Sequence, residues 1–393
     1  MLIVYRILYF TVSHLLLITR HLLPEKLQKW VNLRNQPISI PATNSQRILF
    51  HAASGEIEYV KSIIRNIKQQ RLQIEIYVSY TSPSAEKLFE NISNDVTAFI
   101  ALPWDTRKLM MTFIKKINPD IIVISRTDFW PEFINQAVSQ KIPLIAVSVF
   151  PTMGFFQNIW LKFTLSKMML VTAVTEQLCE KIDTLLNHNV QVLYIPDTRI
   201  DQIIHRLQKP SKFEIKSDHK ICVFGSTWPQ DDQFLIRITD EIISAGYQII
   251  WCPHDISPNR IKNLRTQLKK YSVIIFSEQK NPLHLNHQIL ILDRIGYLAD
   301  MYRYSLFSFV GGSFKSKVHS VMEPLCAGNT VFVGPYFKNN PEAIDGIKNG
   351  TVFSVNNDID FLKDFRKMKL QKISIPQNES TQKTVDLIFS FLN

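Results

Sequence analysis

The chain has 393 residues, which is long enough for two domains of ordinary size that each bury a core. Hydrophobic residues make up 46% of the sequence and it contains only 11 glycines, a composition that excludes a wholly disordered protein. The net charge of +11 indicates an anionic partner, which could be a nucleic acid, an anionic bilayer or a phosphorylated substrate.

Residues 1–23 form the most hydrophobic segment, although Arg6, His14, Arg20 and His21 interrupt it. The uncharged stretch between the two arginines is shorter than the ~20 residues that a membrane span needs. No small-residue cleavage site follows, as a secretory signal peptide would require. We therefore expect a helix that lies in the membrane interface with its basic residues at the headgroups, and a buried amphipathic helix is the alternative.

Short strands then alternate with helices through the first half of the chain. Such alternation predicts βαβ units around a parallel sheet, and ligands bind at the edge where the carboxyl ends of the strands meet. The segments at Glu56, 103–105 and 128–130 each follow a strand, so we expect them at this edge. Strands are expected at 48–53, 74–78, 96–102, 121–124 and 144–149, and helices at 60–67, 84–89 and 106–116.

A less periodic region at 172–209 follows, with one apolar run at 190–195. The polar stretch 208–220 predicts an interdomain linker, because a second alternating unit begins behind it. The fold class is therefore α/β, with two parallel-sheet domains whose loop edges face one another across a cleft. In the second domain we expect strands at 221–224, 247–252, 273–275 and 289–292, and helices at 231–245 and 380–392.

The four cysteines are far apart, and Cys222 and Cys252 lie in strand-like apolar runs. This spacing fits neither a disulfide framework nor a zinc cluster. We expect reduced, buried thiols.

The stretch 309–335 carries the clearest ligand signal. An apolar strand stops at Gly311-Gly312, where backbone without Cβ can turn sharply or lie against a ligand. A basic loop follows, and a helix is expected to begin near Ser320. Its free N–H groups would favour an anion, and Glu323 could accept hydrogen bonds from sugar hydroxyls. The spacing of Ser320 and Glu323 also fits an ordinary capping box, which is the alternative.

Several motifs in a fixed order resemble one family, the transferases that move Kdo (3-deoxy-D-manno-octulosonic acid) from CMP-Kdo onto lipid A precursors. Each motif alone is weak, whereas their shared order makes chance similarity improbable. The resemblance extends to about residue 355. The motifs are SGEIE at 54–58, SYTSPSAE at 79–86, LPWDT at 102–106, DFWPE at 128–132, PDTRID at 196–201, GSTWPQDD at 225–232, PHDI at 253–256, DRIGYLADMY at 293–302, and VGGSF, HSVMEP and VGPYFKNNPEA between 310 and 343.

The resemblance implies a GT-B glycosyltransferase with two Rossmann-like domains. Its parts would be a membrane-associated N-terminal helix at 1–30, an acceptor domain at 31–205 and a CMP-sugar-binding domain at 215–393. It implies no metal and no cofactor, with CMP-Kdo as the donor substrate. The other partners implied are a lipid A precursor and the anionic surface of the inner membrane on its cytoplasmic side, and no nucleic acid.

Three residues match catalytic positions of the family. Glu56 matches the proton acceptor, and Asp128 and Arg199 match the positions that stabilise the transition state. Asp128 stands where the family usually has Glu, and Arg199 where many members have Lys. The plainer alternatives are a helix-start glutamate for Glu56 and a salt bridge to Asp197 or Asp201 for Arg199.

The resemblance also implies a set of CMP-binding positions. Three of them differ from the usual family residue: His254 replaces an arginine, Tyr297 an acidic residue and Ser320 an asparagine. His254 could instead be a structural histidine. A further departure, Ser148-Val149-Phe150 in place of Asn-Ala-Arg, is expected to alter the acceptor pocket. The CMP positions are Pro253, His254, Ile295, Gly296, Tyr297, Ser320, Val321, Met322 and Glu323.

The expected function is therefore inverting transfer of Kdo from CMP-Kdo to a lipid A precursor (lipid IVA) in lipopolysaccharide core biosynthesis. Three alternatives stay open. One is a GT-B transferase or epimerase acting on a uridine nucleotide sugar. Another is a catalytically degenerate protein that binds the membrane surface. The last is a nucleic-acid-binding protein, which would show salt-dependent binding without nucleotide specificity.

Overall fold

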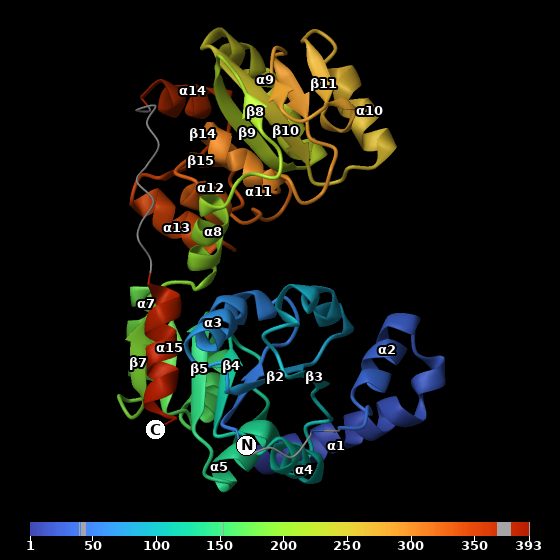
Figure 1. Ribbon diagram of the computed structural model, residues 1–393, viewed down its shortest axis with the longest axis vertical. Coiled ribbons are helices and arrows are strands. Elements are labelled where there is room, and N and C mark those ends of the chain that lie inside the picture. Colours follow the sequence, from blue (N-terminus) through green and yellow to red (C-terminus); the bar gives the residue numbers. More distant parts are fainter. Residues whose placement is uncertain (39, 41–44, 152, 368–378, 393) are drawn as a thin grey trace. The chain divides into compact units, whose positions relative to one another are not determined.

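The computed structural model describes residues 1–38, 40, 45–151, 153–367 and 379–392 (Figure 1). The chain divides into two compact units. Unit 1 comprises residues 1–202 together with the C-terminal segment that contains helix α15, and unit 2 begins at Ile203. Each unit is built around a parallel sheet of seven strands, so the α/β class expected from the alternating pattern is confirmed.

The sheet of unit 1 has the strand order β3-β2-β1-β4-β5-β6-β7. From β1 the chain builds outward to β3 and then returns to place β4 on the other side of β1. The order therefore reverses between β1 and β4, which is the position where open parallel sheets bind ligands. The strands are β1 Arg47–His51, β2 Glu75–Tyr80, β3 Ala98–Ala101, β4 Ile121–Ser125, β5 Leu144–Val149, β6 Leu170–Ala173 and β7 Gln191–Tyr194.

Both faces of this sheet are covered, because its strands are apolar on both sides. Ile48 and Phe50 of β1 pack in one core cluster and Leu49 packs in another, as the two-residue period of a strand requires. Helices α3 Ile57–Gln70 and α15 Ser380–Ser390 contribute to the first cluster. The second is formed with α4 Arg107–Ile117, α5 Pro131–Ser139, α6 Phe155–Leu165 and α7 Glu176–Leu185.

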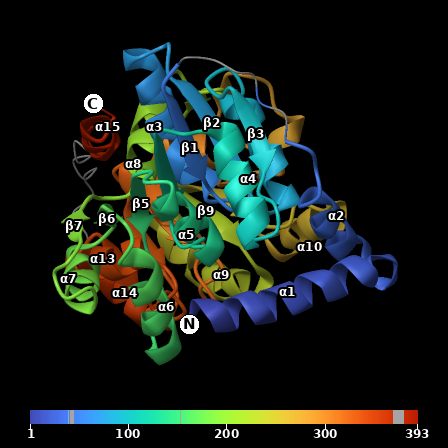
Figure 2. The same ribbon diagram turned by 90° about the horizontal axis from the view of Figure 1, so that it is seen from below.

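Two helices precede this sheet, α1 Leu2–Ile18 and α2 Glu25–Leu33, joined through the short helix η1 Arg20–Leu22. Helix α1 runs along one side of unit 1 (Figure 2), where the hydroxyl of Tyr5 donates to Asp105 at 2.7 Å. Arg6 pairs with the fully buried Glu132. Among the described residues, no helix has both the length and the apolarity that a bilayer crossing requires.

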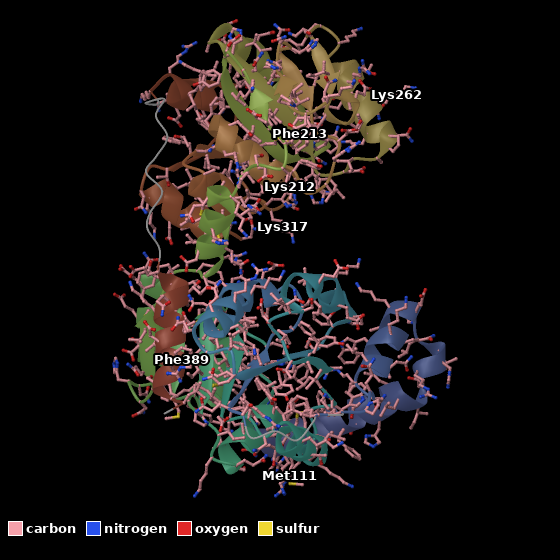
Figure 3. The ribbon with its side chains drawn as sticks, viewed as in Figure 1. Met111, Lys212, Phe213, Lys262, Lys317 and Phe389 are labelled. Carbon is pink, nitrogen blue, oxygen red and sulfur yellow. The ribbon has the colours of Figure 1, made fainter. Side chains whose placement is uncertain are left out.

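The C-terminal helix corrects the expected domain limits. Residues 380–392 were expected in the second domain, but α15 belongs to unit 1 and packs on α3. Val385, Ile388 and Phe389 lie in the core of unit 1 because they complete the apolar face beside α3; Figure 3 labels Phe389. The carboxylate of Asp201 accepts the backbone N–H of Thr381 at 2.6 Å, which fixes the start of the helix.

Unit 2 repeats the doubly wound plan with the order β11-β13-β10-β9-β14-β15-β16, so its order reverses between β9 and β14. The chain enters it within α8 Arg199–Gln208. Its strands are β9 Lys220–Thr227, β10 Tyr247–Pro253, β11 Val273–Ile275, β13 Ile289–Ile291, β14 Ser305–Val310, β15 Thr330–Val333 and β16 Val352–Ser354, with β8 Ile215–Lys216 and β12 Leu283–His284 as a separate pair. Its helices are α9 Pro229–Ser244, α10 Pro258–Gln267, α11 Leu298–Met301, α12 Met322–Cys326, α13 Pro341–Lys348 and α14 Asp358–Lys367.

Local sequence explains where several helices begin. Helices α5, α9, α10 and α13 start with proline in their first turn, where the missing N–H costs no helical hydrogen bond. The helix expected at 84–89 is a 3₁₀ helix, because Pro83 and the bond from Ser84 N–H to Ser82 Oγ favour a tight turn. The remaining 3₁₀ helices are η3 Glu90–Ile92, η4 Phe276–Glu278 and η5 Tyr302–Tyr304.

Candidate functional site

Glu56 lies in the loop after β1, beside the reversal point of unit 1. It is the N-cap residue of α3, and its Oε2 accepts a hydrogen bond from the Ala53 N–H at 3.3 Å. Burial, followed by the negative charge of Asp128, raises the pKa of the Glu56 carboxyl above 4.5. A carboxylate with a raised pKa and partial access to solvent is suited to accept a proton.

Asp128 lies in the loop after β4, on the other side of the same reversal point. Its Oδ2 lies 3.0 Å from His51 Nε2 and accepts the Thr81 hydroxyl at 3.2 Å. Burial acts to raise the pKa of Asp128, but the hydrogen bonds and charge of its neighbours, His51 foremost, outweigh it and the pKa is lowered. Asp128 therefore remains a carboxylate near neutral pH.

A serine completes a chain with these two residues, since His51 Nδ1 lies 2.9 Å from Ser79 Oγ. The order serine, histidine, aspartate resembles a hydrolase triad. Ser79 is fully buried, however, and its hydroxyl donates to the Phe50 carbonyl. A buried serine cannot reach a substrate, so the hydrogen-bonded row of Ser79, His51 and Asp128 serves to orient Asp128.

Arg199 begins α8 and pairs with Asp197. Its Nη2 lies 2.8 Å from Asp197 Oδ2 and its Nε 3.1 Å from Oδ1, so the salt bridge left open by the sequence is formed. The guanidinium also lies 4.1 Å from the ring centroid of Tyr59, which follows Glu56 by one turn of α3. The fold thus brings Arg199 to the helix that begins at Glu56.

In unit 2, the loops after β9 and β14 are locked together at its reversal point. The carboxylate of the buried Asp231 accepts backbone N–H bonds from Trp228 at 2.8 Å and from Gly312 at 2.7 Å. A Cβ at Gly311 would lie 2.4 Å from the Ser226 carbonyl oxygen, so only glycine fits there.

Three rings stack above these loops. Trp228 and His254 are stacked with centroids 4.7 Å apart, and His254 and His319 with centroids 4.6 Å apart. Trp228 Nε1 donates to His319 Nε2 at 3.0 Å, and Lys315 Nζ lies 3.1 Å from the centroid of Trp228. Exposed Lys317, labelled in Figure 3, belongs to the same loop. Aromatic faces beside lysines can hold a planar base and a phosphate.

The pKa of His319 is lowered by burial and then by the positive charges of His254, Lys317 and Lys315. Sequence reasoning selected His254 but missed Trp228 and His319. A usable signal existed, because both follow strands that flank the reversal point, and both lie inside motifs that were already recognised.

The other predicted nucleotide positions have mixed surroundings. Pro253 ends β10, and Ile295 is 85% exposed next to Gly296, whose φ is +89°. The ring of Tyr297 instead packs against Phe276, with centroids 5.0 Å apart, which fixes it in an apolar cluster.

The expected helix at Ser320 begins later than predicted. Helix α12 starts at Met322, its N-cap residue Val321 gives no side-chain hydrogen bond, and both of these residues are buried. The capping box is not formed, because Glu323 instead accepts from Arg206 Nη2 at 3.1 Å. Exposed Ser320 follows His319 directly and is the accessible member of this group.

The cysteines are all free, and Cys222, Cys252 and Cys326 are buried. In the part of the chain that the structure describes, no group of three or more His, Cys, Asp or Glu side chains is placed to hold a metal ion.

Known proteins match this chain over most of its length. Residues 25–202 match the family model of 3-deoxy-D-manno-octulosonic-acid transferase (kdotransferase). The 3-deoxy-D-manno-octulosonic acid transferase of Rickettsia typhi is 23% identical over 344 residues, which cover 84% of this chain and 74% of the relative. The chain is a relative of the Kdo transferases. The 3-deoxy-D-manno-octulosonic acid transferase of Chlamydophila psittaci is 24% identical over 319 residues, which cover 75% of this chain and 70% of the relative. This relationship places the chain among the glycosyltransferases.

The fold is similar to that of solved GT-B glycosyltransferases and sugar epimerases. UDP-GlcNAc 2-epimerase of Neisseria meningitidis matches with a TM-score of 0.60 and 15% identity, covering 88% of this chain and all 100% of that one. A glycosyltransferase of Rickettsia africae matches with a TM-score of 0.53 and 15% identity, covering 89% and 100%. For a Kdo transferase relative, the reversal points of the two sheets are the expected ligand positions.

Proposed function

We propose that the chain is an inverting glycosyltransferase that moves Kdo from CMP-Kdo to a lipid A precursor in lipopolysaccharide core biosynthesis. One observation carries this proposal. In a relative of the Kdo transferases, Glu56 lies at the reversal point of unit 1 with a raised pKa and with the ionised Asp128 nearby.

Glu56 accepts the proton of the attacking acceptor hydroxyl. The oxygen forms a bond to the anomeric carbon of Kdo while the bond to the CMP phosphate breaks, and its electron pair leaves with CMP. Asp128, held by His51, stabilises the positive charge that develops on the sugar. When an anionic group of the substrate displaces Asp197, the Arg199 guanidinium donates two parallel hydrogen bonds to that group.

The stacked rings of unit 2 hold the CMP part of the donor. Trp228, His254 and His319 offer aromatic faces, and Lys315 supplies positive charge. The loop at Gly296 and the segment 320–323 contribute the remaining contacts. The donor is a substrate, and the proposal includes no metal or other cofactor.

The proposed location is the cytoplasmic surface of the inner membrane, with helix α1 as the membrane-binding element. Its exposed residues include Ile3, Val4, Leu8 and Val12, each more than 50% exposed. A helix with so many exposed apolar side chains can lie in the membrane interface, and the net charge of +11 favours anionic lipids.

The decisive experiment measures Kdo transfer from freshly generated CMP-Kdo to tetraacylated lipid A precursor, with CMP release followed in parallel. We expect both products, with neither formed by Glu56→Gln. CMP binding without transfer would overturn the proposed activity and favour a degenerate binding protein.

The epimerase-like neighbours favour one second candidate, a GT-B transferase or epimerase that uses a uridine nucleotide sugar. Calorimetric titration with CMP and with UDP separates the two candidates. Tighter binding of UDP would favour the second.

A further inference from the structure

Arg126 has an unusual backbone conformation. Its φ is +62°, in the left-handed region that non-glycine residues rarely adopt, and its N–H donates to the Val147 carbonyl at 2.9 Å. Such strain persists where the surrounding fold imposes it, and it is concentrated at ligand sites. Arg126 follows β4 directly and lies two residues before Asp128.

The guanidinium of Arg126 is stacked but not paired. It lies 4.5 Å from the ring centroid of Tyr59 and 5.2 Å from that of Phe150. Among the described residues, it has no hydrogen bond and no ion pair, whereas Arg199 on the same Tyr59 ring is paired with Asp197. The charge of Arg199 is therefore neutralised by Asp197, whereas the charge of Arg126 is available to bind a ligand.

Arg126 is also within electrostatic reach of the base. Burial and then Asp128 raise the pKa of Glu56, and the positive charge of Arg126 acts in the opposite direction. A group held by Arg126 would thus lie close to Glu56.

Residues next to Arg126 in the chain and in space line an aromatic pocket of about 480 Å³, which is within the size range of small-molecule sites. Phe150, under Arg126, forms part of its wall. The pocket is lined by Phe129, Phe150, Phe156 and Trp160, with Thr127 and Gln157 as polar groups. Aromatic faces pack against the C–H faces of a sugar ring, and Thr127 and Gln157 can bond its hydroxyls.

We propose that Arg126 and this pocket form a subsite for a sugar that carries an oxyanion, with the guanidinium binding the oxyanion and the aromatic rings packing on the sugar. The inference rests on the proposed transferase activity. The oxyanion is a phosphate of the acceptor or the carboxylate of the donor sugar, and Arg126 binds either with two parallel hydrogen bonds.

The first test compares Arg126→Met with wild type on the phosphorylated acceptor, on the same acceptor after removal of its phosphates, and at varied CMP-Kdo. A phosphate ligand predicts that KM rises about tenfold or more for the phosphorylated acceptor alone, since charged hydrogen bonds are lost. A carboxylate ligand predicts the rise in the KM for CMP-Kdo instead. Unchanged values in all three series would overturn the proposal.

Two further variants make the test specific. Arg126→Lys keeps the charge and should restore part of the affinity. Arg71→Met is the matched control, because it removes another guanidinium stacked on an aromatic ring, 4.1 Å from the Phe389 centroid. A loss of affinity as large in Arg71→Met as in Arg126→Met would contradict a specific role.

Arg126→Gly separates ligand binding from folding. Glycine adopts a φ of +62° without strain, so Tm should rise while the affected KM still worsens. An unchanged KM for both substrates in a folded Arg126→Gly would overturn the proposal.

A binding measurement distinguishes failure of this subsite from failure of the proposed function. Wild type and Arg126→Met are titrated with glucosamine 1-phosphate and with glucosamine, followed by NMR. If wild type transfers no Kdo but binds the phosphosugar through Arg126, the proposed activity fails and the subsite stands. If transfer occurs and both proteins bind the two sugars alike, with unchanged KM values, the subsite fails alone.

Discussion

The fully buried imidazole of His51 holds the carboxylate of Asp128, with 3.0 Å between Nε2 and Oδ2. His51 ends β1 and Asp128 lies in the loop after the neighbouring strand β4, so the register of the two strands brings them together. His51 keeps Asp128 oriented and ionised, although it touches no substrate.

Replacing His51 by Phe should reduce kcat and leave the KM for CMP-Kdo unchanged. The neighbours of Asp128 lower its pKa in the folded state, so its ionised form stabilises the fold. This stabilisation is present above pH 3.8 and is lost as the pH falls through the pKa of Asp128 in the folded protein. Without His51 the acid unfolding midpoint should move upward, and losing the bond should cost ~1–3 kcal/mol. Urea titration at pH 7 measures the loss of stability, and acid unfolding followed downward from pH 5 measures the midpoint. Equal kcat in the two proteins would exclude a positioning role.

Glu56→Gln should lower kcat by about 10²- to 10⁴-fold, because the acceptor hydroxyl loses its base. Affinity for CMP and Tm should stay close to wild type. Glu58→Gln is the control, since Glu58 lies on the same first turn of α3 but is paired with Lys61. Turnover and calorimetric CMP binding are the readouts, and an active Glu56→Gln would refute the assignment.

The activity should fall in acid as Glu56 becomes protonated. Its pKa is raised above 4.5 by burial and Asp128, so the acid limb of kcat/KM should lie above pH 4.5. The effect of Glu56 on folding stability has the opposite sign, because burial destabilises its ionised form. The free energy of unfolding is unaffected by this below pH 4.5 and decreases as the pH rises through the pKa of Glu56 in the folded protein. Rate profiles from pH 4 to pH 8 test this, and the limb should be missing from the residual activity of Glu56→Gln.

The stacked rings of unit 2 predict a loss of nucleotide affinity. Trp228→Ala should weaken CMP binding about tenfold, at the ~1–3 kcal/mol typical of base stacking on aromatic rings. His319→Phe keeps a ring but loses the 3.0 Å bond from Trp228, so it should show a smaller effect. His284→Phe is the control, because His284 is the exposed residue of β12. Unchanged CMP affinity in Trp228→Ala would remove these rings from the donor site.

The exposed face of α1 predicts lipid binding. Replacing Val4 and Leu8, 60% and 62% exposed, by Glu should weaken binding to anionic vesicles more than tenfold, because apolar burial is lost and negative charge is added. Leu72→Glu, at a site 79% exposed outside α1, should bind as wild type does. Vesicle sedimentation measures the difference, and equal binding by both variants would refute an α1 interface.

Periodicity was sufficient for the sheet strands with strong apolar runs, such as β1, β4 and β10. It did not predict β6 or α7. Strand β6 has four residues, too few to show a two-residue period, and most residues of α7 are polar. The motifs located Glu56, Asp128 and His254, because a strand end fixes a side chain at a known edge. They could not show that Tyr297 is packed on Phe276 or that Glu323 is paired with Arg206, since both contacts join segments distant in sequence.

The position of α15 bears on how this protein is made. Unit 2 is inserted in unit 1, between Gln202 within α8 and the segment that contains α15, so α15 is synthesised only after the whole of unit 2. Until α15 is synthesised, the core of unit 1 is incomplete and the apolar face beside α3 stays exposed to solvent. A truncation just before α15 would leave unit 2 whole and expose unit 1 to aggregation and proteolysis.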